Sequence, residues 1–272
     1  MQSNESLREF IENTAREAGA LLRDRLYERH DVQYKGEINI VTEADRLSEK
    51  LIVERISRRF PHYGIMTEES PEKINGSESR WIIDPLDGTT NYAHGYPVFA
   101  VSIALEVEGA ITMGAVYNPM TDEFFVAERG AGSYLNGRQL KVSSTALLSR
   151  SLLATGFPYD IRTNRNNNIN YFKSMAFHAQ AIRRAGSAAL DLACLAAGRF
   201  DGFWELKLAP WDTAAGWLIV EEAGGVVTDL AGGAYNLNSP HILATNGLIH
   251  TDMARIFAAT EPLTSLENSA VA

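Results

Sequence analysis

Two carboxylates three residues apart mark the end of one apolar segment of this 272-residue chain. Trp81–Ile83 is a short hydrophobic run that is followed by Asp84, by Asp87 and then by Gly88. Carboxylate oxygens at the end of a strand suit a hard cation such as Mg²⁺, which prefers oxygen ligands. Gly88 lets the backbone approach an anion closely, and the N–H groups after it bind phosphate if they open a helix. This segment therefore combines metal-binding and phosphate-binding chemistry.

Asp-Pro and Asp-Gly pairs are also common turn signals, so this segment alone does not distinguish a site from a turn. Two other acidic segments favour a site. Gly64–Thr67 is a second short apolar strand, and it ends in the carboxylates Glu68 and Glu69. Trp211 and Asp212 stand at the head of an apolar helical run. Two strands and one helix thus have acidic residues at one end, and three such cases in one chain are hard to explain as turns alone.

Segment 84–91 resembles the first signature of the inositol monophosphatase family, whose members are metal-dependent, lithium-sensitive phosphomonoesterases. Segment 211–216, followed by 221–225, is similar to the second signature of that family. The acidic pair at 68–69 and the segment Thr42–Asp45 stand in the family's order, and the similarity covers nearly the whole chain. The resemblance implies an α+β fold, a five-layer αβαβα sandwich with the metal site between its two halves.

The resemblance also implies two to three bound Mg²⁺ ions. Their implied ligands are Glu68, Asp84, the backbone carbonyl of Leu86, Asp87 and Asp212. The resemblance implies that Asp84 bridges two of the ions. In such a pair, one ion activates a water molecule and the other stabilises the leaving oxygen. Without metal, the same acids repel one another and raise one another's pKa.

A threonine and an aspartate complete the implied catalytic set with Glu68. Thr89 takes the proton of the attacking water and Asp45 is its partner, since threonine alone is a feeble base. Thr42 and Asp45 also have the spacing of a helix capping box. Asp45 therefore has a structural interpretation beside the catalytic one, and one residue can serve both.

The implied substrate contacts come from both halves of the sequence. They are Leu86, Asp87, Gly88, Thr89, Gly186, Ser187, Ala188, Glu205 and Asp212. A carboxylate such as Glu205 suits a polyol, because it accepts hydrogen bonds from vicinal hydroxyls, although it could be an ordinary acid at a strand end. Animal members commonly carry a histidine two positions before the tryptophan of the second signature, where this chain has Ala209. That departure weakens inositol as the sole substrate.

Two further residues have competing interpretations. Asp212 could cap a helix that begins at Thr213, although the resemblance favours a metal ligand. Lys35 aligns with a family lysine near the metals, whereas Lys35-Gly36-Glu37 is also typical of an exposed turn. The role of Lys35 stays open.

These motifs predict a Mg²⁺-dependent phosphomonoesterase that hydrolyses myo-inositol monophosphates to inositol and phosphate. Alternatives in the same class are fructose-1,6-bisphosphatase, histidinol-phosphatase and adenosine 3′,5′-bisphosphate phosphatase activity. The nucleotide alternative is the weakest, because no basic or aromatic cluster stands near Glu205. A regulatory binding protein that keeps the fold is a further alternative. Some bacterial relatives associate with transcription complexes, and Arg183-Arg184 could form a surface contact.

The composition indicates a globular protein, and the net charge argues against certain kinds of partner. Hydrophobic residues make up 45% and charged residues 22% of the chain, which is ordinary for a globular protein. A net charge of −9 argues against binding to nucleic acid or to an anionic membrane. The family resemblance implies a small phosphorylated polyol as the partner. The single cysteine, the lack of a bilayer-spanning apolar run and a polar start unlike a secretory signal predict a cytoplasmic protein. A homodimer is the family expectation.

Hydrophobic periodicity predicts the elements that position these residues. Helices are expected at about 6–29, 43–60, 168–181, 188–197, 213–223 and 248–258. Strands are expected at 64–67, 80–83, 99–106, 112–117, 123–127, 151–155, 202–205, 226–229 and 241–245. The Asn- and Arg-rich segment 159–170 reads as a surface loop, and the strand before Asp84 is expected to break at Pro85. An α+β half over 1–145 and an α/β half over 146–272 are expected to form one compact catalytic unit.

Overall fold

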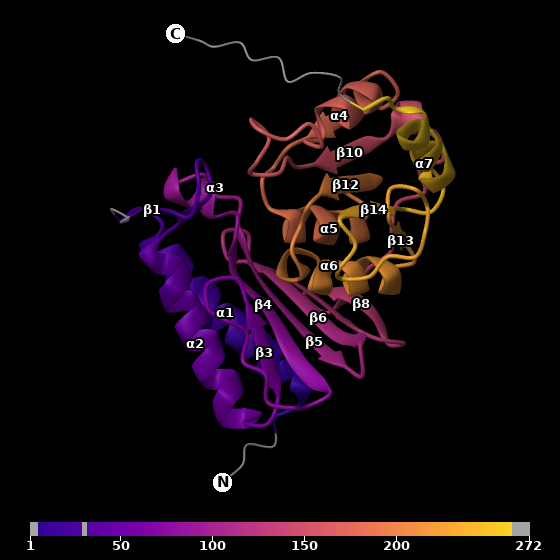
Figure 1. Cartoon of the computed structure of the whole chain (residues 1–272). Coiled ribbons are helices and arrows are strands. Elements are labelled where there is room, and N and C mark those ends of the chain that lie inside the picture. The colour runs from indigo at the N-terminus through magenta and orange to yellow at the C-terminus, as the bar shows by residue number, and fades with distance from the viewer. Residues whose placement is uncertain (1–4, 29–31, 263–272) are drawn as a thin grey trace.

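Two large sheets alternate with three layers of helices in this protein (Figure 1). The structure is a computed structural model that describes residues 5–28 and 32–262. One sheet has seven strands in the order β3-β4-β5-β6-β7-β8-β9, and the other has five in the order β11-β10-β12-β14-β13. This arrangement is the α+β layered sandwich that the sequence predicts.

The seven-stranded sheet is antiparallel except for the parallel pair β3 and β4. Strands β4 to β7 pair with one another in antiparallel register. Side chains alternate along β4, so that Trp81 and Ile83 pack on the outer side of the sheet and Ile82 on the inner side. The strands are β3 Gly64–Thr67, β4 Ser79–Asp87, β5 Ala100–Val107, β6 Ala110–Asn118, β7 Glu123–Glu128, β8 Gly132–Leu135 and β9 Arg138–Gln139.

Helices α1 (Leu7–Arg25) and α2 (Glu43–Arg59) cover the outer face of this sheet (Figure 1). The start of α1 is a capping box, in which Ser6 Oγ accepts from Glu9 N–H at 3.2 Å and Glu9 Oε2 accepts from Ser6 N–H at 2.8 Å. The predicted helix over 6–29 ends earlier, at Arg25, and residue 29 lies outside the described residues. The prediction for α2 is confirmed within one residue of its C-terminal end.

Helices α5 (Ala188–Ala196) and α6 (Pro210–Glu222) form the middle layer and are buried between the two sheets. Their small side chains allow a close approach. A Cβ at Gly114 of β6 would lie 2.8 Å from the backbone of Ala215, so α6 can pack against β6 only because this position is glycine. The residues on either side of the half-buried Cys194 in α5 belong to the core.

The five-stranded sheet packs on the other side of α5 and α6, and helices α4 (Ile169–Ala176) and α7 (His250–Ala259) cover its far face. Strand β10 pairs in parallel with β11 and β12, whereas β14 is antiparallel to β12 and β13. The strands are β10 Leu152–Thr155, β11 Ala181–Arg183, β12 Gly202–Leu206, β13 Val226–Thr228 and β14 His241–Thr245. Among the described residues, no helix has the length and apolarity needed to cross a membrane.

Several predicted boundaries are wrong. The helix expected over 168–181 ends at Ala176, and Ala181–Arg183 is strand β11. The segment expected as a surface loop contains Asn168, which is buried because its side chain bonds the Trp204 indole and the Thr155 hydroxyl. Strand β4 does not break at Pro85 but continues to Asp87 through an irregular register. Elements that were not predicted are β1 Gln33–Tyr34, β2 Ile40–Val41, α3 Thr89–Ala93, β8, β9, β11 and a 3₁₀ turn at Leu148–Arg150.

Candidate active site

The acidic segments of the sequence meet at one edge of the seven-stranded sheet. Thr67 pairs with Ile83 in the parallel register of β3 and β4, so Glu68 follows β3 beside Asp84 of β4. The register between β4 and β5 shifts between Asp84 and Asp87, which marks a local bulge. Bulges re-aim side chains in strands, and here one lies between the two carboxylates of the first motif.

Asp84, Asp87 and Asp212 form an acidic group in which one carboxylate oxygen of each residue lies within 4.8 Å of the other two. Asp84 and Asp87 are buried, and Asp212 is half-buried in the first turn of α6. The predicted helix start at Thr213 is wrong, since α6 begins at Pro210. The Asp212 carboxylate instead accepts from the N–H of Ala209 at 2.6 Å. Three carboxylates from two distant segments are thus held against one another.

Backbone and side-chain donors orient these carboxylates. The Leu86 N–H donates to Asp84 Oδ1 at 3.0 Å. Asp87 Oδ2 accepts from the Ser187 hydroxyl at 2.6 Å and from the Ala189 N–H at 2.7 Å. Asp87 therefore joins the end of β4 to the N-terminus of α5, and the predicted segment 186–188 lies directly against the acidic group.

Burial raises the pKa of every carboxyl in this group. For Asp84 the further causes are the charges of Glu68, Asp87 and Asp212. Burial also raises the pKa of Asp87, to about 6, and that of Asp212 well above its ordinary value. No lysine or arginine in the described part of the chain lies within salt-bridge distance of these three aspartates. The group could therefore hold a cation, which would relieve the mutual repulsion.

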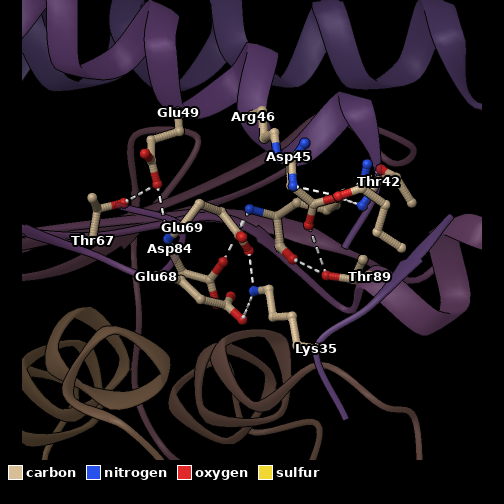
Figure 2. A network of polar contacts seen from close by, with 12 residues as sticks. Lys35, Thr42, Asp45, Arg46, Glu49, Thr67, Glu68, Glu69, Asp84 and Thr89 are labelled. Atoms are coloured by element: carbon tan, nitrogen blue, oxygen red, sulfur yellow. Dashed lines mark hydrogen bonds and ion pairs between the residues drawn. The ribbon is translucent and has the colours of Figure 1, made fainter. Parts of the chain in front are cut away.

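Glu68 lies near this group, and it is paired with a lysine. Lys35 Nζ donates to Glu68 Oε1 at 3.0 Å and also bonds Glu69, as Figure 2 shows. Burial raises the pKa of Glu68 and the lysine lowers it, while burial raises the pKa of Glu69 to about 7. Lys35 is thus not the free exposed turn residue that one interpretation of the sequence predicts, because its amine faces the acidic pair.

Asp45 and Thr89 form the second polar pair of the site (Figure 2). The Thr89 hydroxyl lies 2.8 Å from Asp45 Oδ1 and 3.1 Å from the Leu86 carbonyl oxygen. The other carboxylate oxygen of Asp45 accepts from the N–H and the hydroxyl of Thr42 at 2.8 and 2.6 Å. Asp45 therefore caps α2 and contacts Thr89 at the same time, so its two interpretations are compatible.

Glu49 is a buried carboxylate of the site that sequence reasoning missed. It lies one helical turn after Asp45 on α2 and accepts from the Thr67 hydroxyl at 2.7 Å and the Glu69 N–H at 3.0 Å (Figure 2). The Ser70 hydroxyl also donates a hydrogen bond to Glu49. Glu49 thereby holds the segment that presents Glu68. The i, i+4 spacing to Asp45 was the available signal.

A cavity of about 120 Å³ opens beside these groups and is lined from both halves of the chain. It contains most of the predicted substrate contacts, namely Asp87, Gly88, Thr89, Gly186, Ser187, Ala188, Glu205 and Asp212. Gly88 has φ +99° and caps α3, and a Cβ there would lie 3.0 Å from the Val98 carbonyl oxygen. Glycine therefore lets the loop from the first half pack against Gly186 of the second half.

Glu205, Asp191, Arg184 and Tyr159 line the same cavity. Burial raises the pKa of Glu205 to about 8, and the charge of Asp191 contributes. Asp191 and Tyr159 were not singled out from the sequence, because the first lies in an apolar helix and the second in an apparent surface loop. A larger hollow of about 900 Å³ lies between α1 and α2, but salt-bridged surface residues line it, such as the Arg55–Glu17 pair.

Comparison with known proteins agrees with this geometry. The sequence model of the inositol monophosphatase family matches residues 3–261 of this chain. The chain belongs to this family. An inositol-1-monophosphatase of Synechocystis is 47% identical over 231 residues, which cover 84% of this chain and 80% of the relative. A protein of Pseudomonas aeruginosa named Nus factor SuhB is 46% identical over 240 residues, which cover 85% and 88% of the two chains.

Solved structures of family members have the same fold. The SuhB protein of Bartonella henselae superposes with a TM-score of 0.88 at 42% identity, over 92% of this chain and 98% of that one. An inositol monophosphatase of Anabaena superposes with a TM-score of 0.84 at 44% identity, over 92% and 94% of the two chains. The resemblance inferred from the sequence motifs is thereby confirmed, and family membership supports a phosphatase with a phosphorylated substrate.

Proposed function

We propose that this protein is a Mg²⁺-dependent phosphomonoesterase that hydrolyses myo-inositol monophosphates to inositol and phosphate. The observation that carries the proposal is the convergence of Asp84, Asp87 and Asp212 next to the Thr89–Asp45 pair, at the mouth of a polar cavity. Related sugar or polyol phosphates are the alternative substrates within the class.

The three aspartates, Glu68 and the Leu86 carbonyl would hold two to three Mg²⁺ ions. Their donor set fits, because buried carboxylate and carbonyl oxygens are the ligands that Mg²⁺ prefers and no cationic side chain of the described residues neutralises the three aspartates. Bound Mg²⁺ neutralises phosphoryl charge and lowers the pKa of a coordinated water. Lithium, which is small enough for the same oxygen cage, is expected to inhibit where sodium does not.

The chain's own residues would position the attacking water. Thr89 donates its hydroxyl proton to Asp45, which leaves the Thr89 oxygen able to accept a proton from a water on the opposite side. Thr42 holds Asp45 in that orientation from the start of α2. Phosphoryl transfer requires mainly in-line positioning and charge stabilisation, so rigid hydrogen bonds of this kind matter more than covalent chemistry.

The other end of the cavity would bind the alcohol part of the substrate. Glu205 would accept hydrogen bonds from ring hydroxyls, and the segment Gly186–Ala188 would contact the same ring beside Asp87. Leu86, Gly88, Thr89 and Asp212 would complete the contacts to the ester. Because both halves supply lining residues, we propose that 1–145 and 146–272 act as one catalytic unit. A homodimer is the corresponding expectation for the assembly.

A regulatory role beside or instead of catalysis is the second candidate, and the relatives named Nus factor SuhB support it. The acidic group favours catalysis, because a protein that only binds a partner need not hold two buried carboxylates and a half-buried one close together.

A panel of phosphate esters tests the proposal. With Mg²⁺, the protein should release phosphate from myo-inositol 1-phosphate faster than from fructose 1,6-bisphosphate, histidinol phosphate or adenosine 3′,5′-bisphosphate. EDTA should abolish release, and LiCl should inhibit while NaCl at the same concentration does not. Absence of turnover on every ester with Mg²⁺ would leave the regulatory alternative.

A further inference from the structure

Two carboxylates at the proposed alcohol end of the cavity accept no hydrogen bond from the described residues. Asp191 of α5 and Glu205 of β12 both line the cavity. Within the described residues 5–28 and 32–262, neither has a hydrogen bond or a salt bridge to another side chain or to the backbone. Asp191 is only 2% exposed, so protein atoms enclose it on all sides except the cavity.

An unpaired buried carboxyl is costly to the fold. Removing such a group from water without a donor costs free energy, whether it stays charged or takes up a proton. Burial accordingly raises the pKa of Asp191 well above its ordinary value. A ligand that supplies donors would offset this cost, since the carboxyl already faces the space that the ligand would enter.

Helix capping does not account for Asp191. An acidic side chain in the first turn of a helix interacts favourably with the helix dipole, but this requires no burial. The N-terminus of α5 is already satisfied, because Ser187 Oγ accepts from the Leu190 N–H at 3.3 Å and Asp87 accepts from the Ala189 N–H at 2.7 Å. The N–H groups at the start of α5 therefore do not need the Asp191 carboxylate as an acceptor.

We propose that Asp191 is a specificity residue that binds a hydroxyl of the substrate's alcohol beside Glu205. The inference rests on the proposed phosphatase function and names the substrate class more closely: a monophosphate ester of a polyol with at least two free hydroxyls near the ester. Asp191 lies one helical turn after Ser187, on the same side of α5. Ser187 bonds Asp87 of the acidic group, so α5 links the reacting end of the cavity to the hydroxyl-binding end.

The lining of the cavity disfavours a second phosphate on the substrate. A phosphate offers mainly acceptor oxygens, whereas hydroxyls would donate to both Asp191 and Glu205. Lys207 also lines the cavity, but it is paired with Asp160 at 2.7 Å. Arg184 is exposed at the rim, and it is the one unpaired lysine or arginine among the described residues of the lining. The lining therefore suits neutral polyol groups better than the second phosphate of a bisphosphate.

Substitutions of similar size separate the contributions of Asp191. Asp191→Asn keeps an acceptor oxygen without charge, and Asp191→Leu removes hydrogen bonding. Hydrogen bonds to charged groups predict that kcat/KM for myo-inositol 1-phosphate falls about tenfold in the first and about a hundredfold in the second. The loss on 4-nitrophenyl phosphate, whose leaving group lacks these hydroxyls, should be at least about tenfold smaller.

Thermal stability distinguishes a binding role from a structural one. Because Asp191 has no hydrogen-bond partner in the part of the chain that the structure describes, Asp191→Leu should raise the Tm of the metal-free protein. Asp201 is the matched control: it is a buried aspartate, but it accepts from the Leu152 N–H at 2.7 Å and from the Ser143 hydroxyl at 2.5 Å. Asp201→Leu should lower Tm. The inference is overturned if Asp191→Leu lowers Tm in the same way, or if it reduces turnover of both esters equally.

Product binding keeps the test independent of turnover. Calorimetry measures the binding of myo-inositol to the protein in the presence of Mg²⁺ and inorganic phosphate. Weaker binding to Asp191→Leu than to the unsubstituted protein supports the inference, even if no ester in the panel is hydrolysed and the proposed function fails. Equal binding to both proteins, or binding to neither, contradicts the inference even if the enzyme is active.

Discussion

The two ends of the cavity differ in how their acidic side chains are held. At the reacting end, every aspartate accepts at least one hydrogen bond from the protein, and the donors come from both halves of the chain. At the alcohol end, Asp191 and Glu205 accept none from the described residues. The first end is organised by the fold, whereas the second exposes its acceptors to whatever enters the cavity.

This difference separates reactivity from selectivity. Carboxylates held by backbone N–H groups keep their positions with any substrate, so changes at the reacting end should affect all phosphate esters. Unpaired carboxylates can contribute only through a ligand's own hydroxyls, so changes at the alcohol end should depend on the ester. A buried polar group without a partner lowers stability, and such a cost is common where binding requires it.

Asp87→Asn should have the largest effect and should abolish turnover of every ester. Asp87 belongs to the acidic group and also accepts from Ser187 and Ala189. The amide is nearly isosteric, but it lacks the anionic oxygen that a divalent cation requires. Phosphate release and Mg²⁺ binding by calorimetry should be lost together.

Asp201→Asn is the matched control for that change, since Asp201 is equally buried and hydrogen-bonded but lies outside the site. It should lower Tm and leave Mg²⁺ binding intact. Turnover by Asp87→Asn near the unsubstituted rate would remove Asp87 from the proposed site.

Thr89→Val should reduce kcat by a factor of about 10²–10⁴, the range typical of a lost proton acceptor. Valine keeps the shape of threonine and removes the hydroxyl that bonds Asp45. Thr14→Val is the control, because the buried Thr14 hydroxyl donates to the Phe10 carbonyl within α1, away from the site. If both variants keep the unsubstituted rate, the Thr89–Asp45 pair is structural.

The metal-free protein should lose stability as pH rises from about 4.5, the ordinary pKa of a glutamate, to about 8. The carboxyls of Glu69 and Glu205 have pKa values raised to about 7 and about 8, mainly by burial. In this window the folded state binds more protons than the unfolded state, so the free energy of unfolding falls with rising pH. Glu205→Gln should reduce the slope above about pH 7, because it removes the group with the higher pKa. Tm measured in EDTA that stays flat or rises would contradict these assignments.

Long periodic elements and contiguous motifs could be predicted from the sequence. Helix α2 and strand β3 match their expected bounds closely, because their apolar spacing is regular and Pro61 ends the helix. Strands β8 and β9 were missed because they are short and partly polar. Asn168 was misplaced for a different reason: its burial depends on Trp204 and Thr155, which are distant in sequence.

The candidate site shows the same limit. Carboxylates that follow apolar strands, such as Asp84 and Glu68, stand out locally. Asp191 does not, since its helical neighbours are apolar and only the packing of α5 against the five-stranded sheet turns it toward the cavity. Glu49 likewise becomes recognisable through three donors on another segment. Contacts between distant segments determine these roles, and local patterns do not encode them.

The separation of the two ends is tested most directly by comparing Thr89→Val with Glu205→Gln on two esters. The measurement is kcat/KM for myo-inositol 1-phosphate and for 4-nitrophenyl phosphate, with Mg²⁺ at the same concentration. Thr89→Val should lower both values by similar factors, whereas Glu205→Gln should lower the first by about ten- to a hundredfold and the second far less. Equal losses on both esters in Glu205→Gln would contradict the account, because Glu205 would then belong to the reacting end or to the fold.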